Sequence, residues 1–294
     1  MTKLQDQVVF ITGPARGIGE ALARGLAARG ARLALVGREP ERLAALAREL
    51  GPRHVWFDCD VTSQEQVTRA VDETVRALGG IDVVVANAGI ASHGTIAVTP
   101  MDALARVIDV NVTGVIRTVH ATLQHVTARR GYFLLIASAA AFAPQPGLST
   151  YAASKAAVEQ FGNALRLEVL RDGAAVGVAH PCWIDTDLVR DTRHDLPTFD
   201  ITLSRLPGPF GSVTSVETCT AALIDAIERR RRKIYIPRTL APFAILRHLF
   251  FMSRLADLMI GKPARKSLGR IEREVAANGR VFGEHSVETK GDAG

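Results

Sequence analysis

Short apolar runs alternate with longer segments of helical periodicity from residue 8 to residue 237. The apolar runs predict strands at 8–11, 32–36, 54–57, 81–85, 132–136, 176–179 and 233–237. The segments between them predict helices that include 20–29, 64–78, 101–127, 150–170 and 216–230. This order predicts an α/β fold with a doubly wound, mostly parallel, seven-stranded sheet and helices on both faces.

Five positions that suit a binding site lie just beyond the ends of predicted strands, and they are Gly13, Asp60, Asn87, Ser138 and Pro181. Ligands of open parallel sheets bind beyond the carboxyl ends of the strands. Because these positions follow five different strands, the fold would gather them at one edge of the sheet. We therefore expect the functional site at that edge.

A glycine-rich turn and a helix follow the first strand. Gly13, Gly17 and Gly19 have the spacing G-x-x-x-G-x-G and lead into the predicted helix 20–29. Glycines let backbone amides approach an anion, and a helix N-terminus favours negative charge. Such a turn also occurs for structural reasons alone, but its place after the first strand predicts the phosphate site of a Rossmann-type dinucleotide fold.

The end of the second strand bears on the choice of dinucleotide. Folds that prefer NAD usually carry an acidic residue there, which binds the ribose 2′-hydroxyl. This chain has Gly37 and Arg38 instead, and Arg16 lies in the glycine turn. Two guanidinium groups can bind a 2′-phosphate, so these residues favour NADP(H). In the alternative interpretation Arg38 only pairs with Glu39 or Glu41.

Tyr151 and Lys155 lie four residues apart in the predicted helix 150–170 and therefore share one face. A free phenol has a pKa of about 10, and we expect the Lys155 ammonium to lower the pKa of Tyr151 into a range useful for acid–base catalysis. Ser138 can hydrogen-bond the reacting oxygen. A Tyr–Lys pair of this spacing is more often a helix surface pair, but the upstream motifs favour the catalytic interpretation.

These motifs resemble those of the short-chain dehydrogenases/reductases, in the non-extended branch of that family. The resemblance extends over about residues 8–237. It is carried by Thr12-Gly13-Pro14-Ala15-Arg16-Gly17-Ile18-Gly19, Asp60-Val61, Asn87-Ala88-Gly89, Asn111, Ser138 and Tyr151-Ala152-Ala153-Ser154-Lys155.

The resemblance implies a catalytic set of four residues. Tyr151 is expected to donate or accept the proton, and Lys155 to lower the pKa of Tyr151 and bind the nicotinamide ribose. Ser138 is expected to position the carbonyl group, and Asn111 to support a water relay.

The resemblance also implies cofactor contacts. Asp60 and Val61 are similar to the pair at the adenine, and Ile184 and Thr186 fit the positions at the nicotinamide carboxamide. The complete expected set is Gly13, Ala15, Arg16, Gly17, Ile18, Gly19, Gly37, Arg38, Asp60, Val61, Asn87, Ala88, Gly89, Tyr151, Lys155, Pro181, Ile184 and Thr186.

One position departs from the family pattern. The family usually has Pro-Gly after the sixth strand, whereas here Cys182 follows Pro181. A side chain at this position alters the shape near the nicotinamide, although the chemistry does not require the glycine. We interpret Cys182 as a buried apolar residue rather than a reactive thiol.

Composition limits the number of domains, the cellular compartment and the kinds of site that we expect. The length of 294 residues supports one large core, which we expect over 1–238. The three cysteines and eight histidines show no metal-ligand spacing, and the first seven residues are not a signal peptide. We therefore expect a cytoplasmic protein with free thiols and no metal.

The net charge of +6 is concentrated in residues 229–273, which carry thirteen basic and two acidic side chains. Within them, 239–260 has the pattern of a basic amphipathic helix rather than a spanning helix. We expect 239–283 to form an extension packed on the domain and 284–294 to be disordered. The alternatives are packing on a second subunit and peripheral contact with a membrane through 229–273. Nucleic acid is not expected, because no binding module accompanies the charge.

Residues 187–213 contain several prolines and glycines and few regular repeats, which predicts an irregular lid or binding loop. Because no charge is concentrated in this segment, we expect an apolar or neutral substrate. His194 is expected to be an exposed loop residue. The resemblance implies a homodimer or homotetramer that pairs through 101–127 and 150–170.

The sequence therefore predicts an NADP(H)-dependent oxidoreductase that transfers a hydride between nicotinamide and a ketone or secondary alcohol of an apolar, lipid-like molecule. One alternative is a 3-oxoacyl-(acyl-carrier-protein) reductase, whose acidic partner would dock on 229–233. Another is a non-catalytic NADP-binding sensor or scaffold, for which an incomplete catalytic set is expected. All four catalytic positions are filled here.

Overall fold

Seven parallel strands form one sheet in a computed structural model that describes residues 3–143, 145–196, 199–204, 206, 208–247 and 268–283. The strand order is β3-β2-β1-β4-β5-β6-β7, and each neighbouring pair is parallel. The strands are β1 (Val8–Thr12), β2 (Arg32–Gly37), β3 (Val55–Asp58), β4 (Val83–Ala86), β5 (Tyr132–Ile136), β6 (Ala175–Pro181) and β7 (Lys233–Ile236). The predicted α/β sheet is confirmed, and it is entirely rather than mostly parallel.

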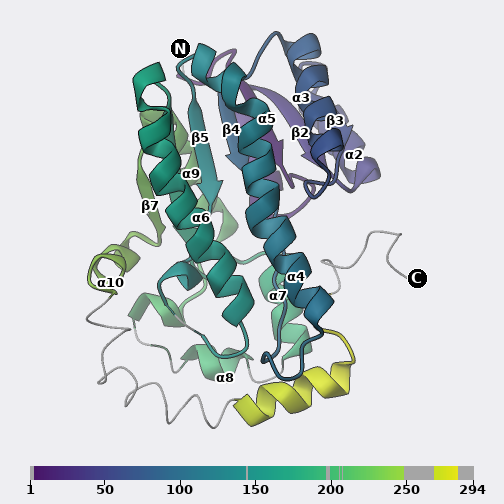
Figure 1. Cartoon of the computed structure of the whole chain (residues 1–294), viewed down its shortest axis with the longest axis vertical. Coiled ribbons are helices and arrows are strands. Elements are labelled where there is room, and N and C mark those ends of the chain that lie inside the picture. The colour runs from purple at the N-terminus through teal and green to yellow at the C-terminus, as the bar shows by residue number, and fades with distance from the viewer. Residues whose placement is uncertain are drawn as a thin grey trace.

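Helices cover both faces of the sheet (Figure 1). One face shares an apolar core with α1 (Gly17–Ala27), α2 (Pro40–Leu50) and α9 (Val216–Arg229). The other face shares a second core with α3 (Gln64–Leu78), α5 (Gly114–Ala128) and α6 (Ser149–Glu168). Because both faces are buried, ligands can reach the sheet at the strand ends, and the strand order reverses direction between β1 and β4.

Capping residues explain why some helix bounds were predictable. Ser63 accepts a hydrogen bond from the backbone amide of Gln66 at the start of α3, and Gly79 ends the helix with φ of 81°. These local signals are the ordinary start and stop of a helix. The predicted bounds of 64–78 are confirmed.

The predicted helix 101–127 is not continuous. It consists of α4 (Met101–Ile108), a π-helical turn (Asp109–Thr113) and α5 (Gly114–Ala128). The turn contains Asn111, whose side chain bonds to a neighbouring loop and to α6 instead of facing solvent. A π turn inserted in an α-helix often marks a functional site, and here it reorients one residue of the expected catalytic set.

The prediction of an irregular loop at 187–213 is wrong. The segment forms α7 (Asp187–Asp195), α8 (Phe199–Ser204) and a 3₁₀ turn (Gly208–Gly211). Val189, Phe199 and Leu203 are buried together in a small apolar cluster. The prolines and glycines therefore separate short helices, which are stabilised by packing rather than by sequence periodicity.

After β7 the chain forms α10 (Ala241–Ile245), and a further helix spans 268–278. This last helix, yellow in Figure 1, lies at the same end of the molecule as α7 and α8. The predicted amphipathic helix 239–260 falls outside the described residues beyond 247, as does the predicted disordered tail 284–294. None of the helices in the described ranges combines the length and apolar character needed to cross a membrane.

Candidate active site

The glycine turn brings β1, α1 and the end of β4 into close contact. Gly13 has φ of 66°, in the left-handed region, and a Cβ there would lie 2.9 Å from the Cα of Ala88. A Cβ on Gly19 would lie 2.3 Å from the carbonyl oxygen of Gly13. Any other residue at either position would displace the backbone, so the glycines keep the N-terminus of α1 open to an anion.

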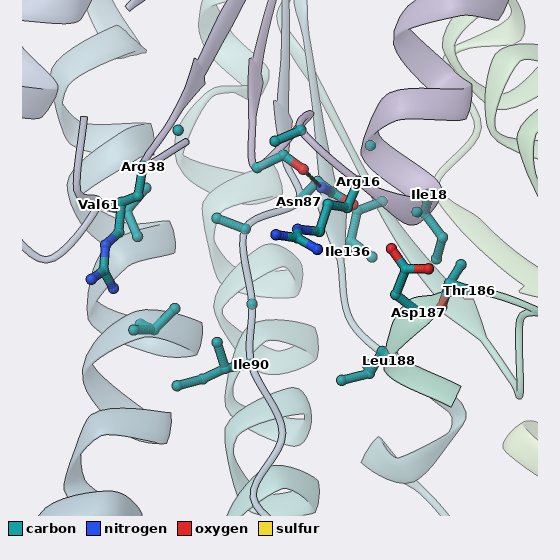
Figure 2. Close-up of a pocket in the computed structure, with 18 of the residues that line it drawn as sticks. Arg16, Ile18, Arg38, Val61, Asn87, Ile90, Ile136, Thr186, Asp187 and Leu188 are labelled. Atoms are coloured by element: carbon teal, nitrogen blue, oxygen red, sulfur yellow. Dashed lines mark hydrogen bonds between the residues drawn. The ribbon is translucent and has the colours of Figure 1, made fainter. Parts of the chain in front are cut away.

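Asn87, directly after β4, ties this turn to the sheet (Figure 2). Its Nδ2 donates to the carbonyl oxygens of Thr12 at 3.0 Å and Gly13 at 2.9 Å. In return, Thr12 Oγ1 accepts from the backbone amides of Asn87 at 3.0 Å and Ala88 at 3.1 Å. The position of the glycine turn is therefore set by four hydrogen bonds across two strands.

A cavity of about 290 Å³ opens beyond the strand ends. Every residue predicted to bind the cofactor lines it except Ile184, which lines a second cavity beside it. The lining residues from the predicted set are Gly13, Ala15, Arg16, Gly17, Ile18, Gly19, Gly37, Arg38, Asp60, Val61, Asn87, Ala88, Gly89, Tyr151, Lys155, Pro181 and Thr186.

Several residues of this cavity were not predicted. They include Asp187, Leu188 and Asp191 of α7 and Glu39 after β2. Figure 2 shows Asp187 and Leu188 directly following Thr186 at the wall of the pocket. Asp187 and Leu188 directly follow Thr186, a predicted cofactor contact, and this adjacency could have indicated them. The expectation of an irregular loop at 187–213 gave no reason to place them at the cavity.

The two arginines expected to bind a 2′-phosphate enter the cavity from different sides (Figure 2). Arg16 donates from Nε to Glu39 Oε1 at 2.7 Å, and Arg38 Nε lies 3.2 Å from Asp60 Oδ2. Arg42 Nε lies 3.6 Å from the same Glu39 oxygen. The arginines therefore line the pocket as members of ion pairs, and the acid paired with Arg38 is Asp60.

Tyr151 lies where two cavities meet. The second cavity, of about 100 Å³, shares Tyr151, Pro181 and Leu188 among its lining with the first. Lys155 lines the first cavity, whereas Ser138 lines the second. The phenol is thus accessible both from the predicted cofactor side and from a separate compartment.

Burial controls the charges of Tyr151 and Lys155. It raises the pKa of Tyr151, although a hydrogen bond with Ser138 acts in the opposite direction. Burial also lowers the pKa of Lys155 to about 8. The Lys155 ammonium lies 5.6 Å from the centre of the Tyr151 ring, over its face. The expectation that Lys155 lowers the pKa of Tyr151 is therefore not met, because desolvation of the phenol dominates.

Ser138 and Asn111 support this pair from two sides. Ser138 Oγ accepts from the amide of Ala140 at 3.1 Å, which orients the hydroxyl at the end of β5. Asn111 is fully buried; its Oδ1 accepts from Ile90 N at 2.8 Å and its Nδ2 donates to Ser154 Oγ at 3.0 Å. Asn111 lines neither cavity, so its side chain connects the loop after β4 to the helix that carries Tyr151.

Lys155 is held by β5. Its Nζ donates to the carbonyl oxygen of Ile136 at 3.0 Å, and a Cβ on Gly89 would lie 3.2 Å from that nitrogen. The glycine of the Asn-Ala-Gly motif therefore leaves room for the lysine head group. This packing brings two motifs that are 66 residues apart in the chain into one site.

Cys182 lines the second cavity together with Tyr151. It is buried and packs with Phe142, Phe210 and Leu240. Burial raises the pKa of its thiol to about 12. The next residue, Trp183, has φ of 42°, an uncommon conformation for a bulky side chain. The interpretation of Cys182 as a buried apolar residue is consistent with this environment.

The first cavity suits a nicotinamide dinucleotide. The helix N-terminus and glycine turn offer backbone donors for a diphosphate. Val61 lies beside Arg38 in Figure 2, and Asp60 is the ion-pair partner of Arg38. Lys155 and Tyr151 line the same cavity. In the part of the chain that the structure describes, no three His, Cys, Asp or Glu side chains group as metal ligands.

Comparison with known proteins agrees with this geometry. A family model described as short chain dehydrogenase matches residues 7–197. The chain is 32% identical over 222 residues to a 3-oxoacyl-[acyl-carrier-protein] reductase of Bos taurus, a match that covers 75% of this chain and 92% of that protein. It is 32% identical over 247 residues to an 11-beta-hydroxysteroid dehydrogenase of Pinus massoniana, which covers 80% and 68% of the two chains.

A solved structure shows the same fold. A 3-ketoacyl-(acyl-carrier-protein) reductase of Brucella melitensis, crystallised with NADH, superimposes with a TM-score of 0.70 over 79% of this chain and 97% of its own. The two sequences are 23% identical, so this likeness concerns the fold alone.

Proposed function

The chain belongs to the short-chain dehydrogenase family and is an oxidoreductase of CH–OH and C=O groups; we propose that it uses NADP(H) and acts on a ketone or secondary alcohol of an apolar molecule. The observation that carries the proposal is the position of Tyr151 at the junction of two cavities. One cavity suits the dinucleotide, and the other would hold the carbonyl group.

Tyr151 is the proposed acid in the reducing direction. Burial keeps its pKa above the ordinary phenol value, so the hydroxyl is protonated at neutral pH and can donate to a developing alkoxide. Ser138 Oγ, which lines the same cavity, would hold the substrate oxygen. In the oxidising direction Tyr151 accepts the alcohol proton, and the bound nicotinamide supplies or accepts the hydride.

Lys155 and Asn111 are proposed to support the proton transfer. The pKa of Lys155, lowered to about 8, leaves the side chain mostly charged at neutral pH and able to stabilise a phenolate after the proton has left. Asn111 connects Ile90 to Ser154, next to Lys155 in α6, and thereby holds the catalytic helix against the cofactor cavity. A water relay at Asn111 is part of the same proposal.

The preference for NADP(H) is supported by Arg16 and Arg38, which line the cavity, and by Gly37 at the end of β2 where NAD-binding folds usually carry an acid. The apolar substrate is supported by the second cavity, whose lining is mainly aliphatic and aromatic. The name of the Pinus massoniana relative, a hydroxysteroid dehydrogenase, agrees with a compact apolar ketone or alcohol.

Exposed apolar side chains on the outer helices, among them Ile116 of α5 and Leu167 of α6, support a homodimer or homotetramer. We place this assembly in the cytoplasm. Size-exclusion chromatography with light scattering tests the oligomer, and a mass equal to one chain would contradict it.

The experiment that tests the function follows NADPH oxidation with a panel of cyclic and aliphatic ketones. Tyr151→Phe should lower kcat by a factor of about 10² to 10⁴ while NADPH still binds. The matched control is Tyr132→Phe, because Tyr132 is also a buried tyrosine but donates to the carbonyl oxygen of Arg231 at 2.6 Å, away from both cavities. A Tyr151→Phe enzyme with most of its rate would remove Tyr151 from the mechanism.

A second candidate is a 3-oxoacyl-(acyl-carrier-protein) reductase, favoured by the name of the Bos taurus relative. The exposed Arg232 and Lys233 at the edge strand β7 offer a basic surface for an acidic carrier protein. Turnover of a carrier-bound 3-oxoacyl thioester, without turnover of the free thioester or simple ketones, would favour this function. Tight NADPH binding without reduction of any carbonyl would instead favour a sensor or scaffold.

A further inference from the structure

Two polar side chains contact each other in the mainly apolar lining of the second cavity. His93, in the loop after β4, and Thr192, in α7, both line it, and they are 8% and 4% exposed. His93 Nε2 lies 3.0 Å from Thr192 Oγ1. This contact joins the two segments that enclose the compartment where the substrate carbonyl is proposed to bind.

The hydrogen bonds of Thr192 determine the tautomer of His93. Thr192 Oγ1 lies 2.7 Å from the carbonyl oxygen of Leu188, which can only accept, so the single hydroxyl proton is donated there. Thr192 must therefore accept at its contact with His93. It follows that Nε2 of His93 carries the proton and that Nδ1 carries a lone pair.

His93 is neutral at physiological pH. Burial lowers its pKa to about 4, although the negative charges of Asp195 and Asp191 act in the opposite direction. A neutral imidazole with the proton on Nε2 presents Nδ1 as a hydrogen-bond acceptor. No described residue donates a hydrogen bond to this nitrogen.

The C-terminal segment holds both partners in place. The amide of His93 donates to Val281 O at 2.7 Å, and the adjacent Ser92 pairs with Phe282 in an antiparallel bridge. On the other side, Arg280 Nη2 lies 2.6 Å from Asp195 Oδ1 of α7. The loop of His93 and the helix of Thr192 are thus both bound to one short stretch of chain, which holds the two segments next to each other.

The rest of the cavity offers little else for polar recognition. Besides Ser138 and Tyr151, which are assigned to the reacting oxygen, the polar residues of the lining are Gln145 and Thr186, and most of the others are apolar. A hydrogen-bond acceptor in such surroundings discriminates strongly between ligands with and without a donor group. A ligand without a donor leaves the acceptor buried and unpaired.

We propose that His93 is a specificity-determining residue whose Nδ1 accepts a hydrogen bond from a hydroxyl group that the substrate carries in addition to its reacting carbonyl or carbinol. Thr192 is a positioning residue that keeps the proton on Nε2. The substrate class is therefore an apolar skeleton with a second, neutral hydroxyl group. This inference rests on the proposed function of the Tyr151 site.

The test compares ketones that differ only in the second group. With NADPH, kcat/KM is measured for 3- and 4-hydroxycyclohexanone and for 3- and 4-methylcyclohexanone. The wild-type protein should favour one hydroxyl isomer over its methyl counterpart by about 10- to 100-fold, as expected when a buried acceptor is satisfied or left unpaired. His93→Phe should abolish this preference, and His93→Asn, which can place an amide oxygen near the position of Nδ1, should retain part of it.

The role of Thr192 is tested by the same ratio of kcat/KM values for hydroxyl-substituted and methyl-substituted ketones. Thr192→Val should reduce the hydroxyl preference and Thr192→Ser should retain it, whereas a merely structural role would lower both rates together. Gln145→Leu is the control for the other flexible polar group. A preference that survives in His93→Phe, or that is lost only in Gln145→Leu, would overturn the assignment to His93, as would equal rates for every hydroxyl and methyl pair in the wild-type protein.

A second measurement separates this inference from the proposed function. Nitrogen-15 NMR of the imidazole should show an Nε2-protonated tautomer, and cyclohexane-1,4-diol with NADP⁺ should move the Nδ1 resonance upfield, whereas 4-methylcyclohexanol should not. If no ketone is reduced, the proposed function fails, and the NMR shifts still decide the role of His93. An Nδ1-protonated tautomer, or an Nδ1 resonance that does not move with the diol, would refute the proposed role of His93.

Discussion

Arg16 Nε donates to Glu39 Oε1 at 2.7 Å, and this ion pair joins the glycine turn to the segment after β2 inside the proposed cofactor cavity. The arginine expected to bind a 2′-phosphate is thus already paired with a carboxylate. An added phosphate would have to compete with Glu39 for the guanidinium or be repelled by its charge. The pair therefore reduces the contribution that Arg16 can make to the proposed preference for NADP(H).

Glu39→Gln should strengthen NADPH binding by about fivefold to tenfold, because it removes about 1 kcal/mol of competition at a partly exposed ion pair. NADH binding should change much less, since NADH lacks the phosphate. Fluorescence titration measures both constants. Glu49→Gln is the matched control, since Glu49 pairs with Arg24 and does not line the cavity. Equal gains for the two nucleotides would argue against a phosphate site at Arg16.

The stability contributed by Lys155 should rise with pH. Its pKa is about 8 in the folded protein, against 10.5 for an unperturbed lysine, so the unfolded chain binds more protons between these values and unfolding becomes less favourable as pH increases. Between about pH 7 and pH 10 the free energy of unfolding of wild type should gain on the order of 2 kcal/mol relative to Lys155→Met. Urea denaturation at each pH measures this, and parallel curves for the two proteins would contradict it.

Glu159 should also contribute stability that rises with pH, but in the acidic range. Burial raises its pKa, but interactions with His180, Arg247 and Lys233 outweigh this and hold the pKa at about 2, below the 4.5 of an unperturbed glutamate. The resulting stability is present above about pH 4.5 and is lost as the pH falls toward 2.

The corresponding measurement compares wild type with Glu159→Gln at pH 6 and pH 3. The advantage of wild type should shrink by on the order of 1 kcal/mol, about half of what the full pKa shift would give at pH 3, because Arg247 and Lys233 are partly exposed to solvent. Arg247→Gln should remove part of the effect because Arg247 Nη1 donates to Glu159 Oε2 at 3.0 Å. An advantage that does not vary with pH would show that the carboxylate is not stabilised by its neighbours.

The native protein should react slowly with thiol reagents. All three cysteines are buried, and burial raises the pKa of Cys59, Cys182 and Cys219 to about 12 in each case. The thiolate is the reactive form, so Ellman's reagent at pH 8 should label almost no thiol in the folded state and three in urea. Rapid labelling of one native cysteine, lost in Cys182→Ala, would show that the residue beside Tyr151 is a reactive thiol.

Local patterns explain what was predictable. The strands and the helix 64–78 depend on short apolar runs, on Ser63 as a cap and on Gly79 as a stop, all of which lie within a few residues of the elements they define. The glycine turn and the Tyr151 motif likewise occupy single short stretches. Their common location at the strand ends follows from the parallel topology, which the alternation of strands and helices already implies.

Packing decided the remaining features. The direction of the Tyr151 pKa shift depends on how much protein covers the phenol, and the pairing of Arg16 with Glu39 depends on side-chain geometry across two elements. The helices of 187–213 form because their apolar residues meet one another, not because the sequence is strongly helical.

The sequence by itself determined the sheet, the phosphate turn and the identity of the residues at the strand ends, because these follow from periodicity and from glycine conformations that neighbours in the chain impose. Only the tertiary structure placed His93 against Thr192 and brought Val281, 188 residues later in the chain, onto the loop of His93. Such contacts arise from the burial of distant segments against each other, and burial is a property of the whole fold.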